Sequence, residues 1–314
     1  MNRLSAYSPN LKQSWMLAFI LVLCQLVASG ILRIFLHNIG IITREWASLS
    51  DSVLAFTVTA LIIVRLGRRS DNVSVATPGE PLINCLCGMK RKAHGAQKPR
   101  YINGIVEVAS AAQRSESPAQ AINQRFPGFS PFLWFLLVPF IWSVSIATGP
   151  LTMWIPMPDT IKQMFMDMSQ FSLPAVLLTV IIAPVFEEWF CRGIILKGLL
   201  KHYSPRKAIV WSAVIFSVLH LNPWQGISAF CGGLAIGWIY WRTRSLRYCI
   251  FMHAAKNTMG FIFVFIFPDV SIDTSLADFT AGYYIYAVAL FACVFTTIGI
   301  NKLISSRTTA DMRN

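Results

Sequence analysis

The chain has 314 residues, of which 55% are hydrophobic and 13% are charged, and its mean hydropathy is +0.55. Soluble domains carry about 25% charged residues, so this composition argues against an ordinary soluble enzyme. A formal net charge of +13 would suggest a nucleic-acid partner in a soluble protein. In so apolar a chain it indicates a membrane protein with basic cytoplasmic loops, and no nucleic-acid partner is expected.

Eight stretches are candidates for membrane-spanning helices, since a span needs roughly 20 apolar residues. In chain order they are residues 15–36, 47–64, 131–149, 172–200, 208–221, 225–241, 246–267 and 283–300. The loops between them alternate between basic and non-basic, as cytoplasmic and outer loops do. The sequence therefore predicts an all-α, polytopic membrane helix bundle of about eight transmembrane helices, with both termini in the cytoplasm.

Four regions follow from this pattern. Residues 1–65 are predicted to form two N-terminal transmembrane helices, the second of which carries Asp51. Residues 66–130 are a basic, polar cytoplasmic insert that is expected to be disordered and to touch anionic lipid. Residues 131–300 contain the other six spans, and residues 301–314 form a cytoplasmic tail.

The fourth span reads APVFEEWFCRG and carries ionisable groups, which are costly inside a bilayer. Glu188 and Arg192 are four residues apart and are expected to pair on one helix face, whereas Glu187 points roughly 100° away. Two acids with one base leave a surplus carboxylate, which suits a general base. An ion pair that only locks the bundle is the alternative. Pro184 removes a backbone hydrogen bond and is expected to kink the helix or admit water.

The fifth and seventh spans carry polar residues at helical spacing. FSVLHLNPW places Phe216 and His220 four residues apart near a helix end, and FMHAAKNTMGF places His253 and Asn257 four apart on one face. Both members of the second pair donate hydrogen bonds, so the pair is suited to hold a developing oxyanion. A satisfied core histidine at position 220, and interhelical hydrogen bonds at the other two, are the alternatives.

The three motifs EExxxR, FxxxH and HxxxN stand in this order on three hydrophobic segments. The ordered set resembles the motifs of the CPBP family (CAAX prenyl endopeptidase and bacteriocin processing, also called Abi), whose members are glutamate-dependent intramembrane proteases. The resemblance covers roughly residues 130–300. It implies an endopeptidase that hydrolyses peptide bonds of a membrane-associated protein or peptide with a glutamate-activated water. A bacterial plasma-membrane location is expected, and the substrate is open.

The resemblance also implies a role for each motif residue. The catalytic residues would be Glu187, His220, His253 and Asn257, and the site-supporting residues would be Glu188, Arg192 and Phe216. The first would be the general base, the second would orient the water, and the third and fourth would form the oxyanion hole. No seryl or cysteinyl nucleophile is required, and no motif places Cys191 as one.

Two questions stay open on the sequence. Glu187, His220 and His253 could instead ligate zinc with an open fourth position, although the usual HExxH helix is absent, and a metal-free water mechanism is favoured. A non-catalytic immunity or scaffold protein, or a transporter that uses these charges as an ion relay, is the alternative function. In ideal straight helices the three residues would lie at different depths. A kink at Pro184, a tilted fifth span or shifted helix ends would bring them together.

Overall fold

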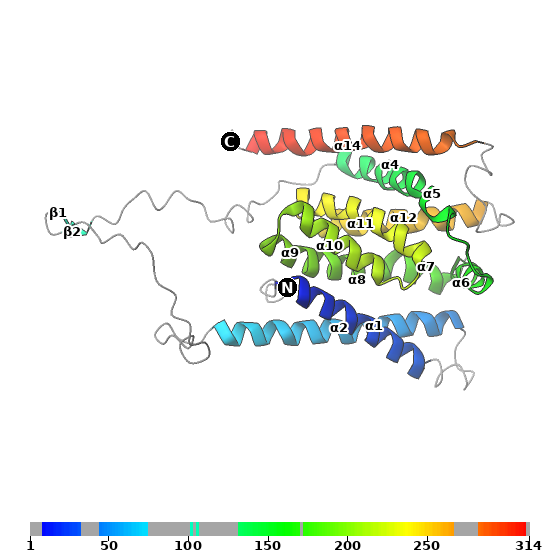
Figure 1. The fold of residues 1–314 in the computed structure, drawn as a ribbon, viewed down its shortest axis with the longest axis horizontal. Helices are drawn as coiled ribbons and strands as arrows, with labels where there is room; N and C mark the ends of the chain where they lie inside the picture. Colours follow the sequence, from blue (N-terminus) through cyan, green and yellow to red (C-terminus); the bar gives the residue numbers. More distant parts are fainter. Residues whose placement is uncertain are drawn as a thin grey trace. The chain divides into compact units, whose positions relative to one another are not determined.

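The computed structural model describes residues 8–32, 44–74, 101–102, 105–106, 131–169, 172–266 and 282–311. Contacts divide the chain into two units, residues 1–71 with 128–314, and residues 72–127. In the second unit, β1 (Tyr101–Ile102) pairs antiparallel with β2 (Ile105–Val106). Every other described element is helical (Figure 1), as the sequence predicts. Most of the predicted insert 66–130 lies outside the described residues.

The helices follow one another with short connections where the chain is described. In order they are α1 (Leu11–Leu32), α2 (Arg44–Ser74), α4 (Pro131–Thr148), α5 (Pro150–Met153), α6 (Asp159–Ser169), α7 (Leu173–Val176), η4 (Leu177–Ile182), α8 (Ala183–Glu188), η5 (Trp189–Leu196), α9 (Lys197–His202), α10 (Pro205–Val218), α11 (Pro223–Thr243), α12 (Leu246–Ile266) and α14 (Tyr284–Asp311). The segments from α7 to α9 run on without a break and together form the predicted fourth span.

Five of the described segments are long and apolar enough to cross a membrane, by length and composition. They are Leu11–Gly30, Ser48–Leu66, Pro131–Met153, Leu173–His202 and Tyr284–Ser306. The predicted fifth, sixth and seventh spans correspond to α10, α11 and α12, which are helical but do not reach this standard. The reason is that α10 has only 14 residues, while the other two carry polar and charged side chains. The count of eight spans and the cytoplasmic termini stay predictions.

The first two helices differ from the predicted spans at their ends. Helix α1 begins at Leu11 because Asn10 and Gln13 form a capping box, in which each side chain accepts the other's backbone N–H at 3.0 Å. Helix α2 continues to Ser74, into the predicted insert. Hydropathy falls at the end of a span, but the backbone can stay helical beyond it, so a hydropathy pattern underestimates helix length.

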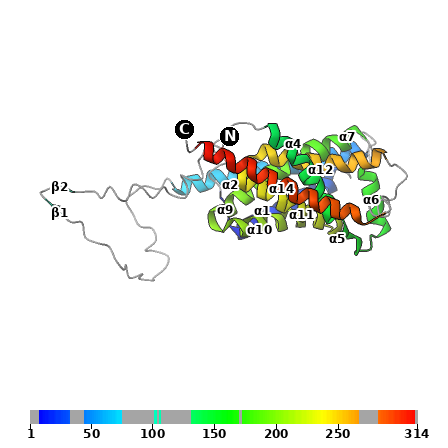
Figure 2. The same cartoon turned by 90° about the horizontal axis from the view of Figure 1, so that it is seen from above.

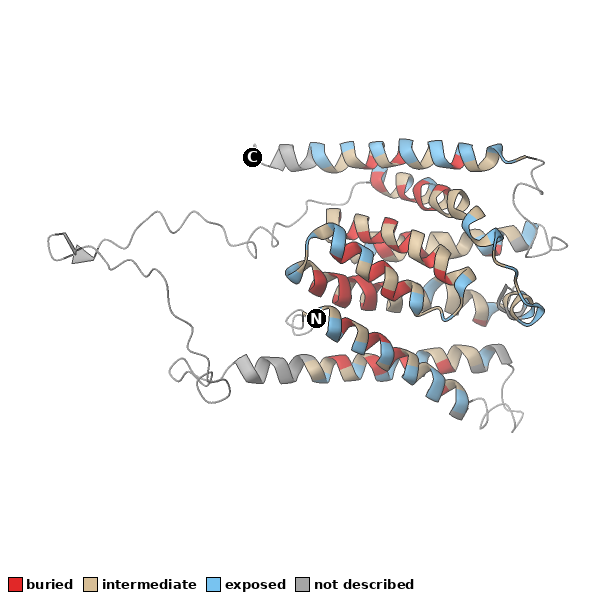
Figure 3. Cartoon of the chain, in the orientation of Figure 1, coloured by how far each residue is buried: buried red, intermediate tan, exposed pale blue. Residues whose placement is uncertain are grey.

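The core of the first unit is built around α10, α11 and α12. Helices α10 and α11 pack along each other as a hairpin, and α12 packs against α4, α8 and η4 (Figures 1 and 2). Helix α14 packs along α4. Buried residues concentrate in η5, α10 and α11, whereas α14 exposes much of its surface (Figure 3). The three predicted motifs thus lie on helices that contact one another.

Candidate active site

The helix that carries the two glutamates has irregular backbone on both sides of them. The α-helical turn α8 lies between the π-helical segments η4 and η5. At the end of η4, the N–H of Ala183 donates to the carbonyl of Leu178, five residues back. The next residue, Pro184, has no N–H, so the carbonyl of Thr179 finds no donor at the corresponding position. The expected irregularity at Pro184 thus takes the form of π-helical backbone, which is frequent at functional sites.

Asn257 supplies the donor that Thr179 lacks. Its Nδ2 donates to the Thr179 carbonyl at 2.8 Å, which ties α12 to η4. Two residues earlier on α12, the carbonyl of Ala255 accepts a hydrogen bond of 2.8 Å from Nε1 of Trp142 on α4. Helix α12 is therefore tied to both η4 and α4 close to the site. Sequence reasoning found Asn257 but not its partner, because the carbonyl is exposed by backbone geometry rather than by residue type.

Glu188 is the centre of a fully buried polar network. Its Oε1 accepts from Nη1 of Arg192 at 2.8 Å and contacts Nδ1 of His253 at 2.9 Å. Nη2 of Arg192 donates to the carbonyl of Gly233 on α11 at 3.1 Å. The side chains of Glu188 and Arg192 are both 0% exposed. The predicted pairing of these two residues is confirmed, and it joins η5 to α11 and α12.

Phe216 on α10 separates the charged network from the rest of the site. The guanidinium carbon of Arg192 lies 4.6 Å from the centre of its ring. The rings of His220 and His253 meet it edge to face, with centroids 5.0 and 5.5 Å away. The aromatic ring thereby fixes the planes of both imidazoles and offers its negative face to a buried cation.

His220 lies just beyond the end of α10, in the turn that leads to α11. Leu221 has a φ of 55°, a left-handed conformation that ends the helix. Asn222 then caps α11, with Oδ1 accepting from the N–H of Gln225 at 2.8 Å, and its Nδ2 donates to the carbonyl of His220 at 2.9 Å. Nδ1 of His220 lies 2.9 Å from the carbonyl of Phe216. Since a carbonyl only accepts, Nδ1 carries the proton, and Nε2 of the neutral ring is an acceptor.

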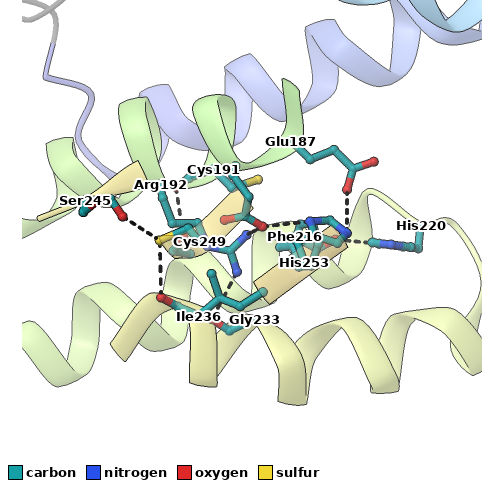
Figure 4. A network of polar contacts seen from close by, with 12 residues as sticks. Glu187, Cys191, Arg192, Phe216, His220, Gly233, Ile236, Ser245, Cys249 and His253 are labelled. Atoms are coloured by element: carbon teal, nitrogen blue, oxygen red, sulfur yellow. Dashed lines mark hydrogen bonds and ion pairs between the residues drawn. The ribbon is translucent and has the colours of Figure 1, made fainter. Parts of the chain in front are cut away.

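Glu187 completes the cluster from the more open side. Its side chain is 24% exposed, and its Oε2 lies 3.9 Å from Nε2 of His253. In Figure 4 the side chains of Glu187, His253 and His220 gather at one end of the network, and those of Cys249 and Ser245 lie at the other end. A partly exposed carboxylate beside an imidazole is an arrangement that can bind and polarise a water molecule.

The structure brings most, but not all, of the predicted site residues into direct contact. Glu188, Arg192, Phe216 and His253 contact one another as described above. Among the described residues, His220 reaches the cluster through the ring of Phe216 rather than through a hydrogen bond to a glutamate. The catalytic roles of these residues stay predictions.

Gly233 was not found from the sequence. A Cβ at this position would lie 3.3 Å from Cα and Cβ of Ala213 and from Cδ1 of Phe216. The absence of a side chain lets its carbonyl approach Arg192. The signal that could have identified it is the small-residue run CGGLAIG, because small residues mark close helix packing in membrane proteins.

One feature of the site resembles a zinc site and another does not. In His220 and His253, Nδ1 lies against an oxygen acceptor and Nε2 is the remaining nitrogen, an arrangement that metal-ligating histidines commonly have. Within the part of the chain that the structure describes, however, no three His, Cys, Asp or Glu side chains are placed to share one ion. The favoured metal-free water mechanism and the zinc alternative therefore both stay predictions.

The fold and the site together define a class. Several membrane-length apolar helices surround a buried polar cluster, which indicates a multi-pass membrane protein. Residues 169–259 match the family model described as type II CAAX prenyl endopeptidase Rce1-like. The matched segment contains all three motifs, and the match confirms the resemblance to the CPBP family of CAAX endopeptidases, which are hydrolases. No curated protein and no solved structure matches the chain.

Proposed function

We propose that this protein is an intramembrane endopeptidase that hydrolyses a peptide bond of a membrane-associated protein or peptide with a water activated by Glu187. One observation carries the proposal. Two adjacent carboxylates have different environments: Glu188 is fully buried and paired with Arg192, while the side chain of Glu187 is 24% exposed. Carboxylates that are separated in this way can take separate roles, one structural and one catalytic.

In the first step, Glu187 takes a proton from a water molecule that it holds together with His220. The resulting hydroxide attacks the carbonyl carbon of the scissile peptide bond and gives a tetrahedral intermediate. The lone pair on Nε2 of His220 is suited to accept a hydrogen bond from this water, because its Nδ1 proton is directed to the carbonyl of Phe216. Asn222 also donates a hydrogen bond to the backbone carbonyl of His220, which restrains this residue.

The intermediate carries an oxyanion that needs donors. His253 directs its Nδ1 proton to Glu188, which as an ionised partner of Arg192 can only accept. With Nδ1 directed to Glu188, Nε2 of His253 is the ring nitrogen on the side of Glu187, and it serves as a donor in the doubly protonated ring. The Nε2–H and the second amide hydrogen of Asn257 then donate to the oxyanion. When the C–N bond breaks, the carboxyl group of Glu187 returns its proton to the leaving amine.

The substrate and location are part of the same proposal. The matched family is described as CAAX prenyl endopeptidases, so a prenylated or otherwise lipid-anchored peptide is the first substrate class to test. The basic loops would face anionic lipid on the cytoplasmic side of a bacterial plasma membrane.

The decisive experiment compares cells that carry the wild-type protein with cells that carry Glu187→Gln at matched membrane levels. Mass spectrometry of protein ends should find termini that vanish with the substitution. Asp159→Asn on α6 is the matched control, because it removes an acid whose side chain is fully exposed, and it should leave those termini in place. Two folded proteins with identical sets of termini would contradict the proposal and favour an immunity or scaffold role.

A further inference from the structure

Lys256 is a cation beside the catalytic cluster that the mechanism above does not use. It lies near the middle of α12, three residues after His253 and one before Asn257. Around the helix axis it is therefore roughly 60° from the histidine, on the side opposite to the asparagine. Its ammonium is close enough to Glu187 and His220 to interact with both electrostatically. A charged residue at such a depth normally faces a pathway or a site rather than lipid.

The neighbouring helix α11 makes room for this side chain. A Cβ at Gly232 would lie 3.3 Å from Cε and 3.4 Å from Cδ of Lys256. Gly232 thus accommodates the stem of the lysine, and the next residue, Gly233, brings its carbonyl to Arg192. Asn257 reaches η4 instead. The lysine and the asparagine therefore border the site on two different sides, at α11 and at η4.

The ammonium of Lys256 is available for an anionic ligand. Among the residues that the structure describes, no carboxylate oxygen lies within 4.0 Å of its nitrogen, and it donates no hydrogen bond. The residue is only partly buried, so a ligand can approach it. When His253 is doubly protonated, as in the mechanism proposed above, it forms with Lys256 and Arg192 a set of three cations. They face only the two carboxylates of Glu187 and Glu188, so a ligand with one negative charge would balance the site.

The substrate class proposed above carries such a charge. A CAAX sequence is the C-terminal end of its protein, so a free carboxylate lies three residues beyond the prenylated cysteine. Three extended residues span at most about 10 Å, so this carboxylate stays close to a bond that is cleaved beside the cysteine. The oxyanion already has donors in His253 and Asn257, which leaves the ammonium of Lys256 for the carboxylate.

We propose that Lys256 binds the C-terminal carboxylate of the peptide substrate and thereby selects which peptides are cleaved. The inference rests on the proposed peptidase function of the Glu187 site and gives it a specificity. The cleaved bond must lie a few residues from a free C-terminus, so an internal segment of a membrane protein is a poor substrate. Lys256 then acts as a specificity-determining residue and takes no part in the chemical step.

The test is a binding measurement with the full-length protein in lipid nanodiscs, carrying Glu187→Gln so that no peptide is consumed. The probes are two fluorescent prenylated peptides with the same CAAX sequence, one with a free C-terminal carboxylate and one with a C-terminal carboxamide. The acid should bind more tightly, on the order of tenfold, because the carboxamide cannot form the charged hydrogen bond. Adding Lys256→Met should weaken the acid to the level of the carboxamide and leave the binding of the carboxamide unchanged.

Further variants separate a specific effect from a loss of fold. Lys256→Arg keeps the charge and should keep a preference for the acid, and so should the control Lys302→Met, which removes an exposed lysine on α14. Equal binding of the two peptides without Lys256→Met, or a preference that survives this substitution, would overturn the assignment. An equal weakening of both peptides at an unchanged Tm would overturn it too, because the ammonium would then support the site itself. The proposed peptidase function stands or falls separately, on the termini that vanish with Glu187→Gln.

Discussion

The polar cluster has two halves that differ in burial and in the length of their ionic contacts. The closed half consists of Glu188, Arg192 and the carbonyl of Gly233, where short contacts of 2.8 and 3.1 Å join fully buried groups. The open half consists of Glu187 and His220, where the carboxylate is 24% exposed and its nearest described ionic contact is 3.9 Å long. A buried ion pair holds elements in place, whereas a partly exposed carboxylate is available for chemistry. Two adjacent glutamates therefore need not be equivalent.

The largest expected effect comes from substituting the two glutamates separately. Glu187→Gln should lower kcat/KM by about 10³-fold, within the range of general acid–base catalysis, and leave the Tm unchanged. Glu188→Gln should lower the free energy of unfolding by about 3–5 kcal/mol, because it leaves the charge of Arg192 buried without its partner. Steady-state cleavage and thermal unfolding in detergent measure the two effects. An equal fall in Tm in both variants would contradict the assignment of a structural role to Glu188 and a catalytic role to Glu187.

A smaller effect should follow from Gly233→Ala in the closed half. The new methyl group would lie 3.3 Å from the backbone of Ala213 and from the ring of Phe216. Such overpacking costs about 1–3 kcal/mol and would move the carbonyl that binds Arg192. Thermal unfolding should report a lower Tm.

Gly260→Ala on α12 is the control for this substitution, because a Cβ there would meet no atom within 4 Å. It should leave the Tm unchanged or raise it, since alanine favours a helix. A similar fall in Tm for both variants would show that the close approach at position 233 is unimportant.

Pro184→Ala tests the irregular backbone that supports the open half. The new N–H gives the carbonyls of the preceding turn a helical donor, which competes with Asn257 for Thr179. We expect a more regular helix, a higher Tm and a several-fold lower kcat with little change in KM. Pro174→Ala is the control, because a proline in the first turn of α7 replaces no helical hydrogen bond. Unchanged kcat in Pro184→Ala would mean that the hydrogen bond from Asn257 to the Thr179 carbonyl does not position the site.

The smallest effect is expected at Cys191, which lies between Glu188 and Arg192 of the closed half in the chain. Its side chain is fully buried, so the thiol has no access to a substrate. Cys191→Ala should keep kcat/KM and lose only a little stability through the lost packing. Abolished activity with an intact fold would instead identify a cysteine nucleophile.

The sequence by itself determined the class of fold and the chemical inventory of the site. Apolar runs predicted membrane-length helices, because hydropathy is a local property, and five such segments occur among the described residues. The spacing of four also predicted the pair of Glu188 and Arg192, because one helix fixes the distance between their side chains. The same local pattern could not determine where α2 ends.

Only the tertiary structure decided how the three motifs meet. Helix packing directs Nδ1 of His253 to Glu188 and its Nε2 to Glu187, so one imidazole links both carboxylates. Packing also brings Asn257 to the carbonyl that is left without a donor before Pro184, and Gly233 to Arg192. These partners are backbone groups, which every residue carries, so sequence patterns do not single them out. Their contacts depend on distances between helices, and those are set by how side chains fill the space between them.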